Sequence, residues 1–388
     1  MKSKWEYSTF GQIMTPAIVE RCKSRSDLPV LSITMHDGIV FQSSRFKKVI
    51  ASVSTEDYKI VRNGQLVIAF PIDEGLIYTQ DVADMGIMSP AYSVWNVDYS
   101  KVERHFLVKY FHSPNAMQYY KSKLRGTTQR RRTLPKDDLL SMPIPIPSIE
   151  EQQRIVAELD LLTSVIDKRK MQLKELDTLA QSIFYDMFGD FSGTECALVE
   201  LCRSKDDIKC GPFGTQLSKS EYQSEGVAVW GIPQINSHFA IAPSDYVSDE
   251  KAVALKDYSV VSGDIVMSRK GNVGQCSVFP DSFEAGIIHS DVLRLRLDYD
   301  KANPVFMMYQ LHLSDSIKHQ IQLVSSGAIM PGINVTKLKN IKVLVPPLTL
   351  QQSFADKIQS IENQKAKIKA SIADTQKLLD YTMDKYFG

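Results

Sequence analysis

The sequence lacks the features of a membrane protein and of a protein from an oxidising compartment. No apolar run approaches the roughly 20 residues that are needed to cross a bilayer. The N-terminal segment MKSKWEYSTF lacks the apolar stretch of a secretory signal. The five cysteines are odd in number and none belongs to a CxxC pair, so neither disulfide bonds nor a zinc knuckle are expected. These absences favour reduced thiols and a cytoplasmic location.

The sequence also lacks the motifs of nucleotide-dependent enzymes. The segment GPFGTQLSKS (211–220) does not have the spacing of a phosphate-binding loop. No glycine-rich turn followed by an acidic residue indicates a dinucleotide or S-adenosylmethionine site, and the Asn/Asp-Pro-Pro-aromatic signature of amino-methyltransferases is absent. His312 and His319 share a predicted helix but have no acidic partner motif for a metal. We therefore expect a binding protein with no catalytic residue, metal site or cofactor of its own.

A long internal repeat is the main feature that is present. Residues 147–189 align without a gap on residues 346–388, which places Gln152 on Gln351 and Phe188-Gly189 on Phe387-Gly388. The same shift aligns shorter pieces upstream, such as NGQLVIAFPIDEG on SGDIVMSRKGNVG. Such a repeat determines the architecture. It predicts two globular domains that alternate with two helices, in the order 1–146 (domain), 147–189 (helix), 190–345 (domain) and 346–388 (helix).

Each copy of the repeat has the apolar pattern of a helix that buries one stripe against another helix. The stripe consists of Leu159, Leu162, Ile166, Leu173, Leu176, Ala180, Ile183 and Met187 in the first copy, and of Ile358, Ile361, Ile368, Ile372 and Leu379 in the second. Arg169 interrupts the first stripe, and Lys365, Thr375 and Thr382 interrupt the second. A helix of about 40 residues is roughly 60 Å long and is rarely stable alone. The two helices are expected to pair, with packing of each on its own domain as the alternative.

The ends of both helices are marked by residues that start or stop a helix. A proline precedes each copy, and Ser148 and Thr349 are the predicted N-caps. Gly189 ends the first copy. The segments before the helices contain many short β-like runs, with helical stretches over 102–125 and 304–323, so each domain is expected to be of mixed α+β type.

The near-neutral total charge conceals a segregation of charge along the chain. Residues 1–150 carry 20 basic and 15 acidic side chains, whereas residues 151–190 carry 5 and 8. Contact with nucleic acid would therefore rely on local basic patches rather than on a basic surface overall.

The candidate DNA contacts are basic and polar residues of predicted loops. Guanidinium groups bind phosphates or read guanine in the major groove; the run of three arginines at 130–132 fits this role, although charge alone fits a solvated surface equally well. The candidate residues are Arg45, Lys47, Lys48, Lys123, Arg125, Arg130, Arg131, Arg132, Gln216, Lys219, Arg269, Lys270, Ser325 and Ser326.

The repeated helix resembles the conserved regions of the specificity subunits of type I restriction-modification systems. The similar segments are PIPIPSIEEQQRIVAEL (143–159) and SIFYDMFG (182–189), with the looser copy LQQSFADKI (350–358) in the second half. The Gly-Asp segment SGDIVMSRKGNVG also resembles part of that family's target-recognition domains. In the first half Gln65 replaces the aspartate and Phe70-Pro71 replaces Arg269-Lys270, so this loop is not expected to do the same job in both halves.

This resemblance implies a division of labour within a larger complex. Each target-recognition domain would bind one half of a bipartite DNA site, and the helices would pair as an antiparallel coiled coil that sets the spacer. Two DNA adenine methyltransferase subunits would dock on equivalent surfaces and use S-adenosylmethionine, and restriction subunits would add ATP- and Mg-dependent cleavage. Two other functions remain open, namely a coiled-coil scaffold with protein-binding ends and a methyltransferase or nuclease with its own recognition domain.

Overall fold

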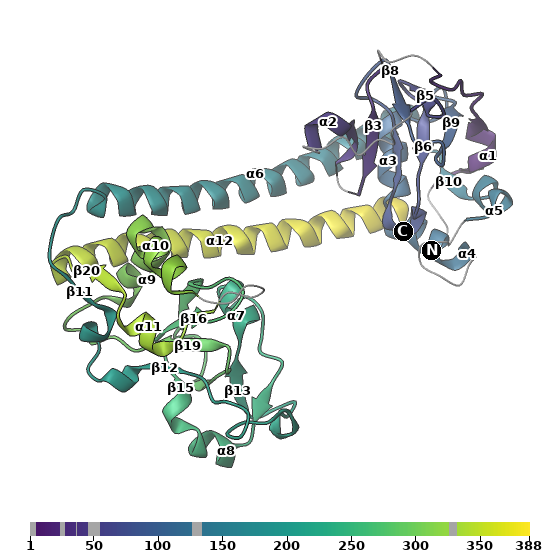
Figure 1. The fold of residues 1–388 in the computed structure, drawn as a ribbon. Coiled ribbons are helices and arrows are strands. Elements are labelled where there is room, and N and C mark those ends of the chain that lie inside the picture. Colours follow the sequence, from purple (N-terminus) through teal and green to yellow (C-terminus); the bar gives the residue numbers. More distant parts are fainter. Residues whose placement is uncertain (1–4, 24–27, 36, 46–54, 126–133, 326–331) are drawn as a thin grey trace. The chain divides into compact units, whose positions relative to one another are not determined.

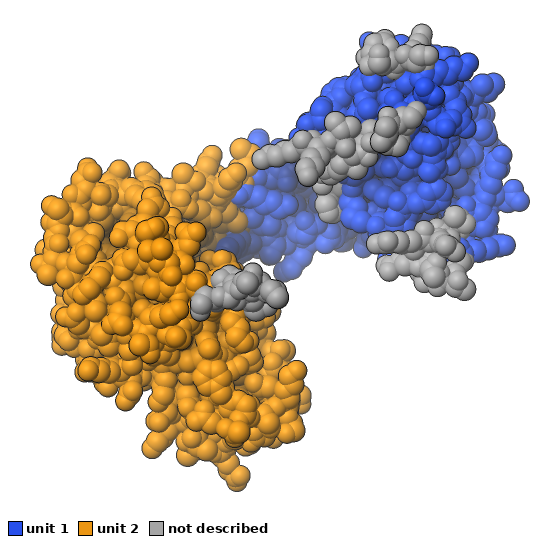
Figure 2. Space-filling model, in the orientation of Figure 1, with its two compact units in different colours: residues 1–170, 369–388 blue, residues 171–368 orange. Residues whose placement is uncertain are grey.

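The computed structural model describes residues 5–388 except for 24–27, 36, 46–54, 126–133 and 326–331. The chain divides into two compact units, residues 1–170 with 369–388 (unit 1) and residues 171–368 (unit 2), which Figure 2 shows in different colours. Two helices of 40 residues, α6 (Ile149–Phe188) and α12 (Leu348–Phe387), each contribute to both units (Figure 1). Both units combine helices with sheets, which confirms the α+β prediction.

Before the long helix, unit 1 contains short strands interrupted by short helical turns, then the helices α3, α4 and α5, and a last strand. These elements are β1 (Tyr7–Thr9), α1 (Phe10–Ile13), β2 (Met14–Pro16), β3 (Leu31–Thr34), β4 (Gly38–Phe41), α2 (Gln42–Arg45), β5 (Lys59–Arg62), β6 (Leu66–Ile68), η1 (Ile72–Glu74), β7 (Ile77–Thr79), β8 (Met85–Met88), β9 (Ser93–Val97), α3 (Arg104–Phe111), α4 (Pro114–Lys123), α5 (Lys136–Leu140) and β10 (Pro143–Pro145).

Unit 2 follows a related plan between the two long helices. Its elements are β11 (Glu195–Ala197), η3 (Leu198–Leu201), η4 (Lys205–Asp207), β12 (Ile208–Cys210), η5 (Lys219–Glu221), β13 (Val227–Trp230), α7 (Ile232–Asn236), β14 (Tyr246–Val247), α8 (Asp249–Ala254), η6 (Lys256–Tyr258), β15 (Ser259–Val260), β16 (Ile265–Ser268), β17 (Cys276–Val278), β18 (Gly286–Ile288), β19 (Val292–Leu295), α9 (Pro304–Leu313), α10 (Asp315–Val324), α11 (Val335–Lys339) and β20 (Lys342–Leu344).

The internal repeat extends to the sheets. Unit 1 contains a four-stranded sheet in the order β2-β9-β6-β7, and unit 2 contains one in the matching order β12-β19-β16-β17. The strand before each long helix also pairs with the first strand of its segment, β10 with β1 and β20 with β11. The repeat is therefore present in the strand pairing as well as in the helices.

The helical stretches expected over 102–125 and 304–323 are each split into two helices. Ser113 accepts a hydrogen bond from the Ala116 N–H and so caps α4. Ser314 does the same for α10 by accepting from the Ile317 N–H. Because an N-cap serine has extended backbone dihedrals, neither stretch can continue through its serine as a single helix.

Within each unit the two long helices pack against each other in an antiparallel sense. In unit 1 the start of α6 meets the end of α12, where the Arg154 Nη2 donates to the Tyr386 hydroxyl (3.1 Å) and that hydroxyl donates to Glu158 (2.7 Å). In unit 2 the end of α6 meets the start of α12, and Lys365 Nζ lies 2.7 Å from Asp177 Oδ1. Pairing of the helices is thus confirmed.

The polar residues that interrupt the second apolar stripe satisfy their hydrogen-bonding groups locally. Lys365 forms ion pairs with Asp177 across the helix pair and with Glu362 on its own helix, both at 2.7 Å. The hydroxyl of Thr382, which is 3% exposed, donates to the Leu378 carbonyl at 2.7 Å. Since a buried polar group is tolerated when its hydrogen bonds are made, these residues do not disrupt the packed helix pair.

The last aromatic residue of each helix is anchored in the core of a unit. Phe188 packs in unit 2 against Phe306 (ring centroids 4.7 Å apart) and Phe354 (5.5 Å). Phe387 occupies the equivalent place in unit 1, against Phe106 at 5.3 Å. The long helices therefore do both things that the sequence allowed: they pair with each other, and each also packs on the globular cores.

The starts of the helices are held by a buried glutamine in each copy. Gln152 accepts from the Glu103 N–H (2.7 Å) and donates to the Pro147 carbonyl (2.8 Å). Gln351 likewise accepts from the Asn303 N–H (2.9 Å) and donates to the Pro346 carbonyl (2.7 Å). These bonds explain why glutamine occurs at this position of both copies.

Only one of the two predicted N-caps is correct. The Ser148 hydroxyl accepts from the Glu151 N–H at 3.3 Å, as expected for a cap. The Thr349 prediction is wrong because α12 begins at Leu348, so the threonine lies inside the first turn. The carbonyl of Pro347 instead accepts from Leu350 and Gln351 and starts the helix.

Replacement of Gln351 by alanine is expected to lower the free energy of unfolding by roughly 2–4 kcal/mol, because the Asn303 N–H and the Pro346 carbonyl would each lose a partner. Denaturant unfolding of purified protein measures the change. The control is Gln359→Ala, which removes an exposed glutamine of the same helix. Equal losses in the two variants would contradict the anchoring role of Gln351.

Candidate nucleic-acid interface

The register of the unit 2 sheet brings three loops to one edge. Cys210 at the end of β12 pairs with Leu293, and Ser268 at the end of β16 pairs with Val292. Cys276 at the start of β17 pairs with Met267. The segments 211–217, 269–275 and 289–291 therefore all leave or enter the sheet at this end. We call this set of loops the unit 2 loop edge.

The first of these loops lies against the third through a glycine that admits no side chain. A Cβ on Gly211 would lie 2.2 Å from the carbonyl oxygen of His289. Beyond this contact, Phe213 and Gln216 close a tight turn, because the Gln216 N–H donates to the Phe213 carbonyl (2.7 Å) and the Phe213 N–H donates to Gln216 Oε1 (3.3 Å). The Phe213 side chain remains 52% exposed. The predicted contact residue Gln216 thus positions its neighbour.

Arg269, a predicted contact residue, lies at the centre of the unit 2 loop edge. Its guanidinium carbon is 4.9 Å from the centroid of the Phe213 ring. Its Nη1 donates to Cys210 Sγ (3.3 Å) and to the Ser290 carbonyl (3.4 Å). Burial raises the pKa of the Cys210 thiol despite the nearby guanidinium, so the thiol stays protonated and donates to the same carbonyl at 3.2 Å. These contacts hold one side of the guanidinium in place.

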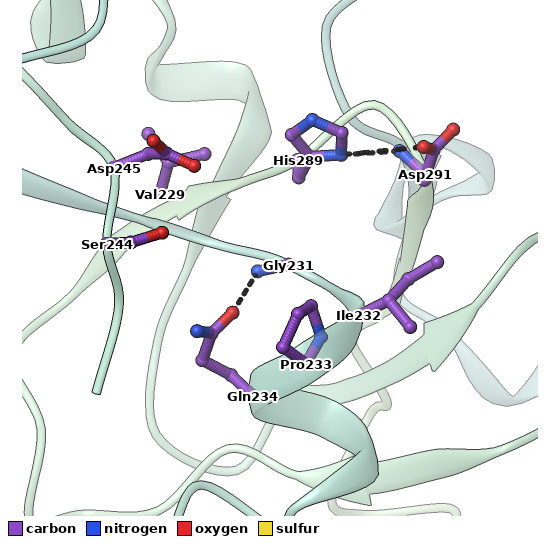
Figure 3. A pocket seen from close by; sticks show the side chains of 9 residues that line it. All are labelled: Val229, Gly231, Ile232, Pro233, Gln234, Ser244, Asp245, His289 and Asp291. Carbon is purple, nitrogen blue, oxygen red and sulfur yellow. Dashed lines mark hydrogen bonds and ion pairs between the residues drawn. The ribbon is translucent and has the colours of Figure 1, made fainter. Parts of the chain in front are cut away.

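Lys270 lies beside a shallow pocket of unit 2. Its Nζ is 2.7 Å from a carboxylate oxygen of Asp291, which lines the pocket together with His289 (Figure 3). The Asp291 N–H donates to His289 Nδ1 at 3.1 Å, so the neutral imidazole carries its proton on Nε2. Gln234 is occupied structurally, since its Oε1 accepts from the Gly231 N–H (3.0 Å). The pocket therefore presents a histidine N–H beside a paired lysine and carboxylate.

A second groove separates the 269–275 loop from α10. Its lining includes Asn272, Gln275, Lys318 and Gln322, together with Ser325, which was predicted as a contact residue. The chain then returns to the loop edge, where the Ile333 N–H donates to the Arg269 carbonyl at 3.1 Å. Ser325 thus lines this groove with residues 271–275, which directly follow the Arg269-Lys270 pair, whereas Lys219 is in η5.

Unit 1 has an equivalent loop edge with different side chains. The chain leaves β2 at Pro16 and β6 at Ile68, and both strands flank β9. The exposed side chains next to these ends are Ile18 (101% exposed) and Phe70 (49%), and Phe70 stands at the repeat position of Arg269. The replacement of an arginine by a phenylalanine means that the two edges present different chemistry.

The other predicted contact residues of unit 1 lie at or within the segments that the structure does not describe. Lys123 is the last residue of α4 and Arg125 follows two residues later, and both pair with Asp138, at 3.6 and 3.5 Å. Arg45 is the last residue of α2. The remaining predicted residues, Lys47, Lys48, Arg130, Arg131, Arg132 and Ser326 of unit 2, lie outside the described residues.

Comparison with known protein families shows to which family the chain belongs. A model described as the type I restriction modification DNA specificity domain matches residues 29–177 and again residues 207–375. The chain belongs to this family. The two matches cover the two segments that the repeat relates, so this specificity-domain family is represented twice in one polypeptide.

Curated members of the specificity family align with much of the chain. The type I restriction enzyme MjaVIII specificity subunit of Methanocaldococcus jannaschii is 25% identical over 268 residues, which is 63% of this chain and 60% of that protein. A putative type I specificity subunit of Haemophilus influenzae is 25% identical over 292 residues, or 72% and 71% of the two chains. The chain thus spans 60% to 65% of the three M. jannaschii relatives.

Solved structures share the fold along the whole chain. A chain from a structure of type I R-M complex assembly and conformational transition superposes with a TM-score of 0.61 at 20% identity, covering 99% of this chain and 97% of that one. The type I restriction-modification S subunit of M. genitalium gives 0.58 at 13% identity, covering 100% and 97%. The architecture of two repeated units with paired helices is therefore that of the specificity family.

The described residues of this family member contain neither a metal centre nor a membrane span. Within the described ranges, no three His, Cys, Asp or Glu side chains are grouped so that they could hold a metal ion. No helix in that part of the chain has the length and apolar character required to cross a bilayer. The five cysteines, all within the described ranges, form no disulfide bond, and burial raises the pKa of the Cys276 thiol.

Sequence reasoning did not identify Phe213. The spacing of the Gly-Pro-Phe-Gly segment excludes a phosphate loop, but this spacing carries no information about the aromatic side chain. The usable signal was an aromatic residue between two glycines in a polar segment. Its relation to Arg269 depends on the sheet register, which joins positions far apart in the sequence.

Joint replacement of Arg130, Arg131 and Arg132 by alanine is expected to weaken DNA binding and flatten its salt dependence. If all three contact phosphates, the slope of log K against log salt decreases in magnitude by up to about 2.7. Titration of the assembled complex onto duplex DNA at several salt concentrations measures this slope.

The matched control removes the same number of positive charges elsewhere. The control residues are Arg203, Lys205 and Lys301, which lie where β12 begins and β19 ends, at the end of the unit 2 sheet opposite the loop edge. Arg203 and Lys301 both pair there with Asp298. Joint replacement of the three control residues by alanine is expected to leave the salt slope nearly unchanged. An unchanged slope in the variant of the 130–132 run would contradict its phosphate-binding role.

Proposed function

We propose that this chain is the DNA sequence-recognition subunit of a type I restriction-modification complex. The observation that carries the proposal is the double match of the DNA specificity domain to the two repeated segments. Each unit would read one half of a bipartite site through its loop edge. The different side chains at the two edges, Arg269 in unit 2 and Phe70 in unit 1, support the reading of two different half-site sequences.

The paired helices would fix the distance between the two half-sites. Two readers joined by a rigid element recognise half-sites at a separation set by that element. The repeat gives the chain two equivalent helix surfaces, which suits docking of two DNA adenine methyltransferase subunits. Restriction subunits would complete the nuclease form of the complex in the cytoplasm.

Catalysis would reside in the partner subunits rather than in this chain. The methyltransferase subunits would bind S-adenosylmethionine and act on adenine that has been rotated out of the duplex, and the restriction subunits would use ATP and Mg. The alternative of a methyltransferase or nuclease with its own recognition domain predicts that the isolated chain binds S-adenosylmethionine. The alternative of a coiled-coil scaffold predicts no preference among duplex sequences.

A binding selection tests the proposal directly. The chain is co-purified with its methyltransferase subunits and incubated with a library of random-sequence duplexes, and the bound fraction is sequenced. The proposal predicts a split motif with a fixed gap. Recovery of duplexes with no shared motif would support the scaffold alternative.

A further inference from the structure

We propose that Phe213 and Arg269 act as one base-contacting pair, in which the Phe213 ring packs on the methyl group of a thymine and Arg269 reads a guanine in the adjacent base pair. The inference rests on the proposed function and assigns particular chemistry to the unit 2 loop edge. Phe213 was not among the residues that the sequence indicated.

Hydrogen bonds within the loop hold Phe213 in its exposed position. A single exposed apolar side chain needs no explanation by itself. Here, however, two hydrogen bonds between Phe213 and Gln216 fix the turn, and the Gln216 Oε1 is also held by the Tyr258 hydroxyl at 3.0 Å. Gly214 beside it has no heavy atom within 4 Å of a built Cβ. The ring is therefore fixed at the border of open space.

The guanidinium of Arg269 is pre-oriented by the same cluster. One of its faces lies on the Phe213 ring at 4.9 Å, and Nη1 is directed at Cys210 and at the Ser290 carbonyl. Among the described residues, Nε and Nη2 have no hydrogen-bond acceptor. Two donors on a held guanidinium match the O6 and N7 acceptors of guanine in the major groove. Pre-orientation reduces the side-chain entropy that is lost on binding.

The spacing of the two groups suits neighbouring base pairs. Base pairs in B-DNA are stacked about 3.4 Å apart along the axis, and the ring centroid and the guanidinium carbon are separated by 4.9 Å. Of the groups on a major-groove edge, the thymine methyl is the one that an apolar side chain such as phenylalanine contacts favourably. Arginine and phenylalanine side by side therefore specify a guanine next to a thymine.

The neighbouring lysine is less suited to base reading. Lys270 is paired with Asp291 at 2.7 Å, so it must give up this partner before it can bind DNA. Lys270 is thus engaged, whereas the partly buried Arg269 keeps Nε and Nη2 without an acceptor among the described residues, and the Phe213 ring beside it is exposed.

The test uses the full chain assembled with its methyltransferase subunits and the random-duplex selection. Phe213→Ala is expected to relax the preference at one thymine of the second half-site by about five- to a hundredfold, and Arg269→Lys to relax the adjacent guanine to a similar degree. The first half-site should be unchanged in both variants, and this shows that the complex is folded. Tyr299→Ala is the matched control, because Tyr299 is a 51% exposed aromatic residue near the opposite end of β16.

A second probe isolates the methyl group. Replacement of the identified thymine by deoxyuridine should weaken binding by the wild-type complex but leave the affinity of the Phe213→Ala complex unchanged. An unaltered base preference in Phe213→Ala would overturn the proposed pair. So would a loss of affinity on replacement of thymine by deoxyuridine that is equal in the wild-type and Phe213→Ala complexes. A wild-type complex with no base preference would overturn the proposed function itself.

Discussion

A variant that lacks one heptad from each long helix is expected to recognise the same two half-site sequences at a shorter separation. The deletion removes residues 164–170 of α6 and residues 372–378 of α12, which lie opposite each other if the register set by Asp177 and Lys365 continues. Seven residues correspond to about 10 Å of helix, or up to about three base pairs at 3.4 Å each. The variant should therefore lose most of its affinity for the native site, toward the non-specific level, which is at least about a thousandfold weaker.

The measurement is the random-duplex selection, read separately for half-site sequence and gap length. A full heptad is removed because it returns the apolar stripe to nearly the same face of the helix. The control deletes residues 164–170 from α6 alone, which should disrupt helix pairing instead of resetting the gap. A changed half-site sequence, or a gap that stays at its native length, would refute the spacer role.

Replacement of Phe188 by alanine is expected to lower the free energy of unfolding of unit 2 by about 3–5 kcal/mol, the usual cost of emptying a core phenylalanine site. Phe188 is 6% exposed and packs against Phe184, Phe306 and Phe354. Because it is the last residue of α6, the loss should also free the end of that helix. Hydrogen exchange of α6, α9 and α12 locates the change, and denaturant unfolding measures its size.

The control for this variant is Leu179→Ala, which shortens a 47% exposed side chain on the same helix. It should change stability by less than about 0.5 kcal/mol, as is usual for surface substitutions. A loss of similar size in both variants would show that helix propensity, rather than the aromatic anchor, accounts for the effect. Phe387→Ala should reproduce the Phe188 result in unit 1, where Phe387 packs on Phe106 and Tyr110.

The helices could be predicted from the sequence because their stability depends on a local pattern. The apolar steps of three and four that include Leu159 and Ile166 are visible within a single stretch, and both residues are buried. From the sequence, Lys365 is only a polar residue that interrupts the apolar stripe of the second helix. Its ion pair could not be predicted, because its partner Asp177 lies on the other helix. The start of α12 was misplaced because Thr349 is a good capping residue, whereas the carbonyl of Pro347 begins the helix.

The loop edges were harder to predict because strand pairing joins distant residues. Cys210 lies beside Leu293, and no feature near either residue indicates this partner. Arg269 and Lys270 stood out through their glycine-bounded loop, and the structure places them at the loop edge, where their DNA contacts remain a prediction. Phe213 became notable only when the sheet register brought it to the Arg269 guanidinium.

Modified-base sequencing of host DNA, with the gene intact, deleted and restored, tests the central claim most directly. If the chain reads a bipartite site for an adenine methyltransferase, a split motif with methylated adenine in both halves will be present with the intact gene. It will disappear on deletion and return on restoration. Methylation that is the same in all three strains would contradict the account.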